Sequence, residues 1–86
     1  MNEIENLRGK IDQIDGQILE LLSDRFACAK KIGEFKKKNG LPILDQDRWQ
    51  ELIADRMEFA KKIQLPEGFL EELLELIHKY SIRAQE

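Results

Sequence analysis

The fold of this chain is decided by residues 4–38, which read IENLRGKIDQIDGQILELLSDRFACAKKIGEFKKK. Apolar side chains recur in this stretch at alternating intervals of three and four residues, at Ile4, Leu7, Ile11, Ile14, Ile18 and Leu21. This heptad spacing predicts an amphipathic helix over residues 3–38, whereas a strand would alternate at every second residue. No proline occurs before Pro42, and Asn39-Gly40 is a typical helix stop.

The length of this helix predicts an oligomer. At a rise of about 1.5 Å per residue the helix is about 54 Å long. A compact chain of 86 residues has a radius of gyration of only about 12 Å. A single copy would therefore leave much of the apolar stripe in water, and we expect an intertwined homodimer in which two long helices cover each other.

Two shorter helices are expected after the proline. Asp45 is a suitable N-cap for a helix over about residues 45–64. Pro66 suits the first turn of another helix, over about residues 66–85. The predicted fold is therefore all-α, with three helices in a single domain that spans residues 1–86.

The composition excludes several function classes. The chain has 14 basic and 17 acidic residues and a net charge of −3, which argues against a nucleic-acid-binding surface. The sequence shows no apolar run that would span a membrane and no secretory signal. The one cysteine, Cys28, cannot form an internal disulfide and is expected to be a small core residue. We expect a cytoplasmic protein that needs no metal ion and no organic cofactor.

Polar residues on the first helix interrupt the apolar pattern. Arg25 occupies a heptad position that is otherwise apolar, which is costly unless an anion meets it. Lys36 follows 11 residues later, about 20° around the helix axis, so the two cations share one face. Arg8 lies about 100° from Arg25 and would instead serve an anion site of the partner chain. The alternative for Arg25 is a side chain that reaches solvent, or a structural ion pair.

The shorter helices add further polar candidates. Asp45 and Arg48 are neighbours on one face, with a surface ion pair as the alternative for Arg48. Ser81 and Gln85 extend an apolar stripe, with a fraying polar end as the alternative. His78 has no evident partner and is expected at the surface or only lightly packed.

These residue types limit the chemistry. The sequence contains no Ser/His/Asp set, no Gly-rich phosphate loop and no Cys/His cluster for a metal. The candidate groups are cations and hydrogen-bond donors around an anionic ligand. They suit a reaction that is helped by conformational restraint and electrostatic stabilisation, without a nucleophile or a proton transfer.

Seven polar residues, in this order and at these intervals, resemble the all-helical chorismate mutase family over essentially the whole chain: Arg8, Arg25, Lys36, Asp45, Arg48, Ser81 and Gln85. Local strings agree as well, such as Leu21-Leu22-Ser23-Asp24-Arg25 and Pro42-Ile43. The resemblance implies an isomerase that converts chorismate, a dianion, to prephenate by a concerted 3,3-rearrangement within one molecule. It also implies an intertwined homodimer with two active sites, each of which uses residues from both protomers.

The resemblance assigns the main contacts to the substrate. Arg25 would bind one carboxylate, and Arg8 of the other protomer would bind the second. Lys36 and Gln85 would donate hydrogen bonds to the ether oxygen, which gains negative charge as its C–O bond breaks.

The remaining matched residues lie around the ring of the substrate. The resemblance implies that Asp45 holds the ring hydroxyl, that Arg48 lines the pocket and that Ser81 contacts a carboxylate. One position departs from the family, because Trp49 stands where a glutamate usually accepts a hydrogen bond from that hydroxyl. An indole only donates hydrogen bonds. Isochorismate pyruvate lyase and 4-amino-4-deoxychorismate mutase therefore remain alternatives on this scaffold, as does a non-catalytic helical dimerisation or regulatory module.

Overall fold

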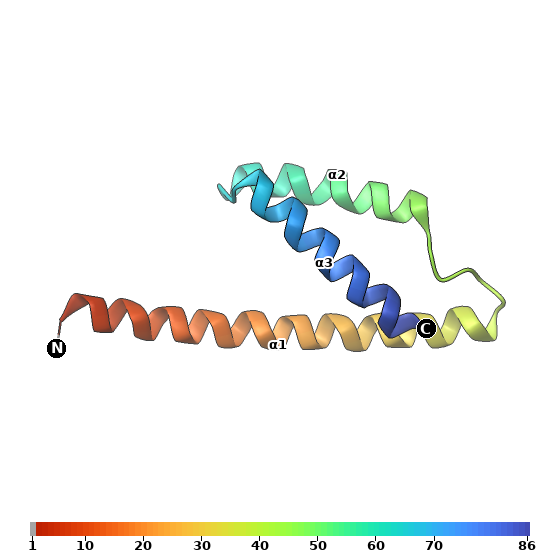
Figure 1. The fold of residues 1–86 in the computed structure, drawn as a ribbon, viewed down its shortest axis with the longest axis horizontal. Coiled ribbons are helices and arrows are strands. Elements are labelled where there is room, and N and C mark those ends of the chain that lie inside the picture. The colour runs from red at the N-terminus through yellow and green to blue at the C-terminus, as the bar shows by residue number, and fades with distance from the viewer. Residues whose placement is uncertain (1) are drawn as a thin grey trace.

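The structure, a computed structural model, describes residues 2–86 as three helices joined by two loops (Figure 1). Helix α1 spans Glu3–Lys38, α2 spans Gln46–Lys62 and α3 spans Glu67–Gln85. The described residues contain no strand. The predicted all-α fold with three helices is confirmed, and each helix ends within two residues of its predicted limit. In this part of the chain, no helix has the length and hydrophobicity that crossing a bilayer requires.

Helix α1 begins and ends at residues with capping chemistry. The side chain of Asn2 accepts a hydrogen bond from the backbone N–H of Glu5 at 2.9 Å, which satisfies one of the free donors of the first turn. At the other end, Gly40 adopts a φ of 64°, a left-handed conformation that glycine takes without steric cost. The N–H of Leu41 then bonds back to the carbonyl of Lys36 at 2.8 Å, which closes the last turn.

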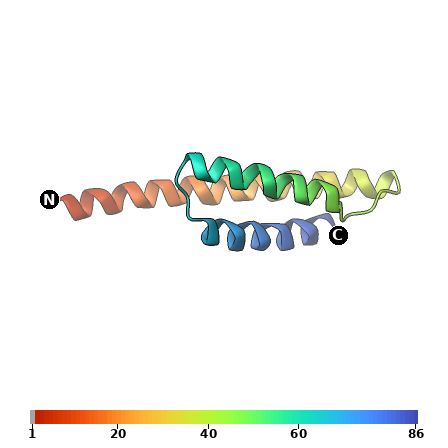
Figure 2. The same ribbon diagram turned by 90° about the horizontal axis from the view of Figure 1, so that it is seen from above.

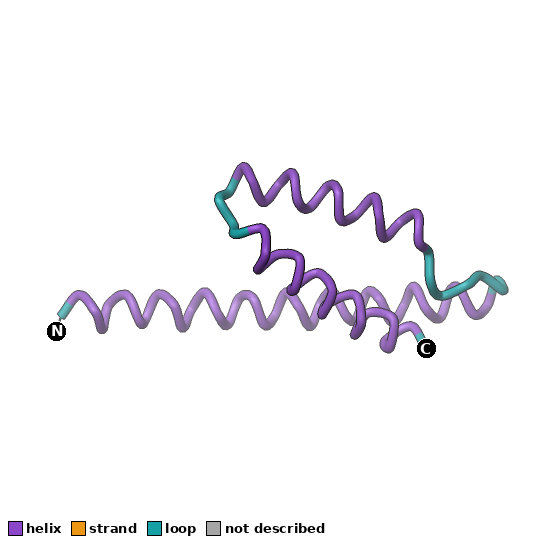
Figure 3. Tube along the Cα trace, turned by 45° about the horizontal axis from the view of Figure 1, so that its top comes forward, coloured by secondary structure: helices purple, strands orange, loops and turns teal. Residues whose placement is uncertain are grey.

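Helix α3 makes the packing contacts that hold the three helices together. It packs against α1 and against α2, while α1 and α2 make no close backbone contact with each other among residues 2–86 (Figures 1 and 2). The buried core lies between α2 and α3 and consists of Leu52, Ala60, Leu70 and Leu74. Figure 3 shows the two loops at opposite ends of α2, so the chain runs away from the end of α1 and returns along α3.

The N-terminal part of α1 extends beyond the other helices (Figure 1). The described residues measure 58 × 24 × 16 Å and have a radius of gyration of 16.4 Å, against about 12 Å for a compact chain of this length. The predicted apolar stripe is open to solvent in the single chain, with Leu7 49% and Ile11 54% exposed. The homodimer that would cover this stripe stays a prediction.

Candidate active site

A cavity of about 430 Å³ opens between the three helices, next to the C-terminal half of α3. Its charged and polar lining residues are Arg25, Lys36, Asp45, Arg48, Arg56, His78, Ser81 and Gln85. Trp49 lies in the wall as well. The structure thus brings together, in one place, every residue of the predicted site except Arg8.

Arg25 is held in the cavity by a hydroxyl group. Its Nη1 donates a hydrogen bond to Oγ of Ser81 at 2.6 Å, and Ser81 is the buried polar residue of the described chain. A guanidinium has five N–H donors, so most of them remain for a ligand. Burial lowers the pKa of Arg25, and repulsion from Arg56 and Arg48 lowers that pKa further. An anion between these groups would relieve both penalties.

Lys36 and Gln85 form a pair of donors at the end of α3. The Nζ of Lys36 donates to Oε1 of Gln85 at 3.0 Å and to the carbonyl of Ile43 at 2.8 Å. Of the three N–H groups of the ammonium, one is left for a ligand, and the side-chain NH₂ of Gln85 is left as a second donor. The helices meet closely here, because a Cβ on the buried Gly33 would lie 2.5 Å from Cα of Gln85.

Asp45 and Arg48 are joined through the N-terminus of α2. Oδ1 of Asp45 accepts a hydrogen bond from the backbone N–H of Arg48 at 3.0 Å, which makes Asp45 the N-cap, as its sequence position predicted. The guanidinium of Arg48 is free of the surface ion pair that was its alternative, since no ion pair within residues 2–86 includes it.

The cavity carries an excess of positive charge. Within the described residues Arg25, Lys36 and Arg48 have no carboxylate partner, while Arg56 pairs with its neighbour Asp55. The structural ion pair considered for Arg25 is therefore wrong. Cations that outnumber the carboxylates around a cavity make a site for an anionic ligand.

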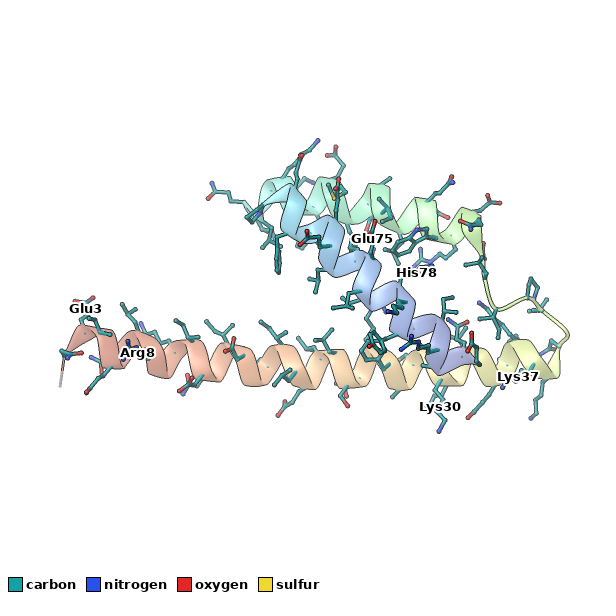
Figure 4. All side chains as sticks on the ribbon, in the orientation of Figure 1. Glu3, Arg8, Lys30, Lys37, Glu75 and His78 are labelled. Carbon is teal, nitrogen blue, oxygen red and sulfur yellow. The ribbon has the colours of Figure 1, made fainter. Side chains whose placement is uncertain are left out.

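Arg8 does not reach this cavity within one chain. It lies on α1, 17 residues before Arg25, which corresponds to about 25 Å along the axis. Figure 4 shows Arg8 on the part of α1 that extends beyond the other helices, far from His78. Its assignment to the site of a partner subunit stays a prediction.

Comparison with known sequences identifies the family. The sequence model of the family described as "Chorismate mutase type II" matches residues 7–86. The chain belongs to this family. The resemblance inferred from the polar residues is therefore confirmed, and with it the expectation of an enzyme rather than a plain dimerisation module is supported.

Three relatives illustrate the similarity. The chain is 41% identical over 63 residues to a "Bifunctional chorismate mutase/prephenate dehydratase" of Aquifex aeolicus, covering 73% of this chain and 17% of the relative. It is 39% identical over 57 residues to a "Chorismate mutase" of Methanocaldococcus jannaschii, covering 66% and 57%. It is 31% identical over 77 residues to a "4-amino-4-deoxychorismate mutase" of Streptomyces venezuelae, covering 88% and 74%. The chain spans less than two thirds of the length of the first two relatives.

Two further residues, His78 and Cys28, line the cavity beside the predicted set. His78 is half-buried in the cavity wall of this chorismate mutase-family chain, where its ring stacks on Trp49 with the centroids 3.8 Å apart and an interplanar angle of 18°. The expectation that Cys28 is a core residue is wrong: it is exposed, because it lies on the face of α1 that lines the cavity.

Spacing is the signal that would have identified the additional cavity residues. His78 precedes Ser81 and Gln85 at intervals of three and four residues, so all three share one face of α3. Arg56 follows Trp49 by seven residues on α2 and shares its face in the same way. Apolar core residues follow the same spacing, so the packed structure is needed to distinguish a residue that lines the cavity from one that packs in the core.

Proposed function

We propose that this chain is a chorismate mutase, an isomerase that converts chorismate to prephenate in the cytoplasm, and that the cavity is its active site. The observation that carries the proposal is the set of three cations without carboxylate partners, Arg25, Lys36 and Arg48, around one cavity. Chorismate is a dianion, and the names of the relatives quoted above support it as the substrate.

The first contribution of the site is restraint. Ser81 fixes the guanidinium of Arg25, whose remaining donors match the two oxygens of a carboxylate. Arg48 supports the anionic end of the ligand from α2. Because the rearrangement forms its C–C bond as the ether C–O bond breaks in the same molecule, holding the substrate in a reactive conformation replaces nucleophilic or proton-transfer chemistry.

The second contribution is electrostatic. The ether oxygen is a weak acceptor in the substrate and gains negative charge in the transition state. Lys36 is held in place by two hydrogen bonds, and it offers its third N–H beside the NH₂ group of Gln85. Donors that are already oriented stabilise the developing charge more than the ground state, and so they raise kcat.

The proposed active form is a homodimer, in which Arg8 of the partner subunit binds the second carboxylate. Two surfaces of the single chain favour a second copy as the occupant. One is the exposed apolar stripe of α1. The other is a groove of about 510 Å³ between α1 and α3, lined mainly by apolar residues that include Leu22, Phe26, Leu73 and Leu76. The long helix of a second copy would cover both surfaces.

The test is to incubate the protein separately with chorismate, with isochorismate and with the 4-amino analogue of chorismate, and to identify the products. Prephenate from chorismate, lost in Arg25→Ala, supports the proposal. Trp49 in place of the usual glutamate favours the other substrates as second candidates, together with the relative from Streptomyces venezuelae. Release of pyruvate from isochorismate, or turnover of the 4-amino analogue alone, would overturn the assignment to chorismate.

A further inference from the structure

The stacked pair of Trp49 and His78 is a part of the cavity to which the proposed mechanism gives no role. The two rings come from different helices, α2 and α3, and both are half-buried. Among residues 2–86, no hydrogen bond uses a ring nitrogen of His78. The stack therefore fixes the plane of the imidazole while its nitrogens stay free for a ligand.

The position of His78 along α3 indicates which end of a ligand it meets. Ser81, which holds Arg25, lies one turn further along the helix, and Gln85 lies one turn beyond Ser81. His78 is thus about 10 Å along the axis from the donors assigned to the ether oxygen, and it is next to the guanidinium that binds a carboxylate. Arg25 also perturbs His78 directly, since burial and then repulsion from Arg25 lower the pKa of the imidazole.

Cationic side chains predominate among the charged groups around His78, while the carboxylate of Glu75, exposed on α3, lies one turn before it (Figure 4). The charged side chains that line the cavity with it are Arg25 and Lys36 on α1, and Asp45, Arg48 and Arg56 at or on α2. Asp45, the one carboxylate among them, is exposed and caps the first turn of α2 through Arg48. A ligand carboxylate would add negative charge on the side of His78 that faces the cavity.

We propose that His78 is a substrate-binding residue, whose ring N–H donates a hydrogen bond to the carboxylate that Arg25 binds, and that Trp49 is the positioning residue that holds the ring there. This inference rests on the proposed function. In the free protein burial and then repulsion from Arg25 disfavour the protonated imidazole, whereas a bound carboxylate favours it. Substrate binding therefore takes up a proton at pH values between the two pKa values of His78.

The first arm of the test is the pH dependence of KM for chorismate. Histidine is the side chain that ordinarily titrates between about pH 5 and 8. For the wild type we expect KM to fall as the pH is lowered through this range, by as much as about tenfold per pH unit where one proton is taken up. Calorimetry of prephenate binding in two buffers of different ionisation enthalpy should detect the same proton without any substitution.

The second arm uses matched variants. His78→Gln keeps a donor that does not titrate, so its KM should be independent of pH. His78→Phe keeps an aromatic ring against Trp49 and loses the donor, so its KM should rise about tenfold or more. Its kcat should change less than about threefold, because a carboxylate is bound equally in the ground state and the transition state. Trp49→Phe preserves the stack and should retain the pH dependence.

Several outcomes would overturn the inference. A wild-type KM that is constant or rises as the pH is lowered would do so, and a rise would indicate instead that the neutral ring accepts a hydrogen bond from the substrate. An unchanged KM in His78→Phe, or the same pH profile in His78→Gln as in the wild type, would also refute it. In each of these cases chorismate turnover by the wild type leaves the proposed function standing, whereas absence of turnover would refute both.

Discussion

The close approach of α1 and α3 at Gly33 gives the sharpest test of how this site is built. A Cβ added to Gly33 would lie 2.5 Å from Cα of Gln85, 2.6 Å from its carbonyl oxygen and 2.9 Å from its carbonyl carbon. These are backbone atoms, so no side-chain rotation relieves the contact. In Gly33→Ala the end of α3 must therefore move away from α1.

The size of this movement follows from contact distances. Non-bonded carbon atoms rest at about 3.5–4.0 Å, so Gln85 must shift by about 1 Å or more. Its hydrogen bond from Lys36, at 3.0 Å, would then be stretched out of range. Because Gln85 ends its helix, part of the strain is relieved by fraying of the last turn, and we expect a loss of stability of about 1 kcal/mol, the low end of the cost of overpacking. The displaced donor should nevertheless lower kcat by about 100-fold.

The assay is steady-state turnover of chorismate together with thermal unfolding at one fixed protein concentration. Gly16→Ala is the matched control, because Gly16 also lies within α1 and a Cβ there meets nothing within 4 Å in the chain. We expect the control to keep its kcat and to gain up to about 1 kcal/mol from the better helix propensity of alanine. Wild-type kcat in a folded Gly33→Ala protein would refute the argument that this contact positions Gln85.

Three further expectations test the charges and the assembly. Lys36→Ala should lower kcat by about 100-fold or more and change KM less. The control is Lys38→Ala, at an exposed lysine at the end of the same helix, which should change neither constant. A variant Lys36→Ala with a raised KM and an unchanged kcat would contradict the role of Lys36 at the ether oxygen. Arg8→Ala and Arg25→Ala should each be nearly inactive alone, and mixing them under conditions of proven subunit exchange should restore activity, whereas no recovery would argue against a site shared between copies. Sedimentation should show a dimer, and turnover should survive chelation of metal ions; a stably folded monomer, or rescue of a chelated enzyme by a metal, would contradict these expectations.

Much of this fold could be predicted from the sequence, because the patterns that determine its helices involve residues close together in the chain. The heptad spacing of α1 and the capping role of Asp45 depend on neighbours a few residues apart. Arg25 and Lys36 were also assigned to one face from one helix alone, and both line the cavity. The stacking of His78 on Trp49 was not predicted, because it depends on how α2 packs against α3, which no single helix specifies.

The charge distribution connects the stability of this chain to its ligand. The chain as a whole is acidic, with a net charge of −3, yet Asp45 is the one carboxylate that lines a cavity surrounded by four cationic side chains. Burial and then repulsion from Arg56 and Arg48 lower the pKa of Arg25, so holding its charge in the cavity costs stability in the free protein. A bound dianion reverses that cost, so part of the repulsion present before binding becomes attraction after it. The cations are thus concentrated around one cavity of an otherwise acidic chain, which favours a small dianion over an extended polyanion such as a nucleic acid.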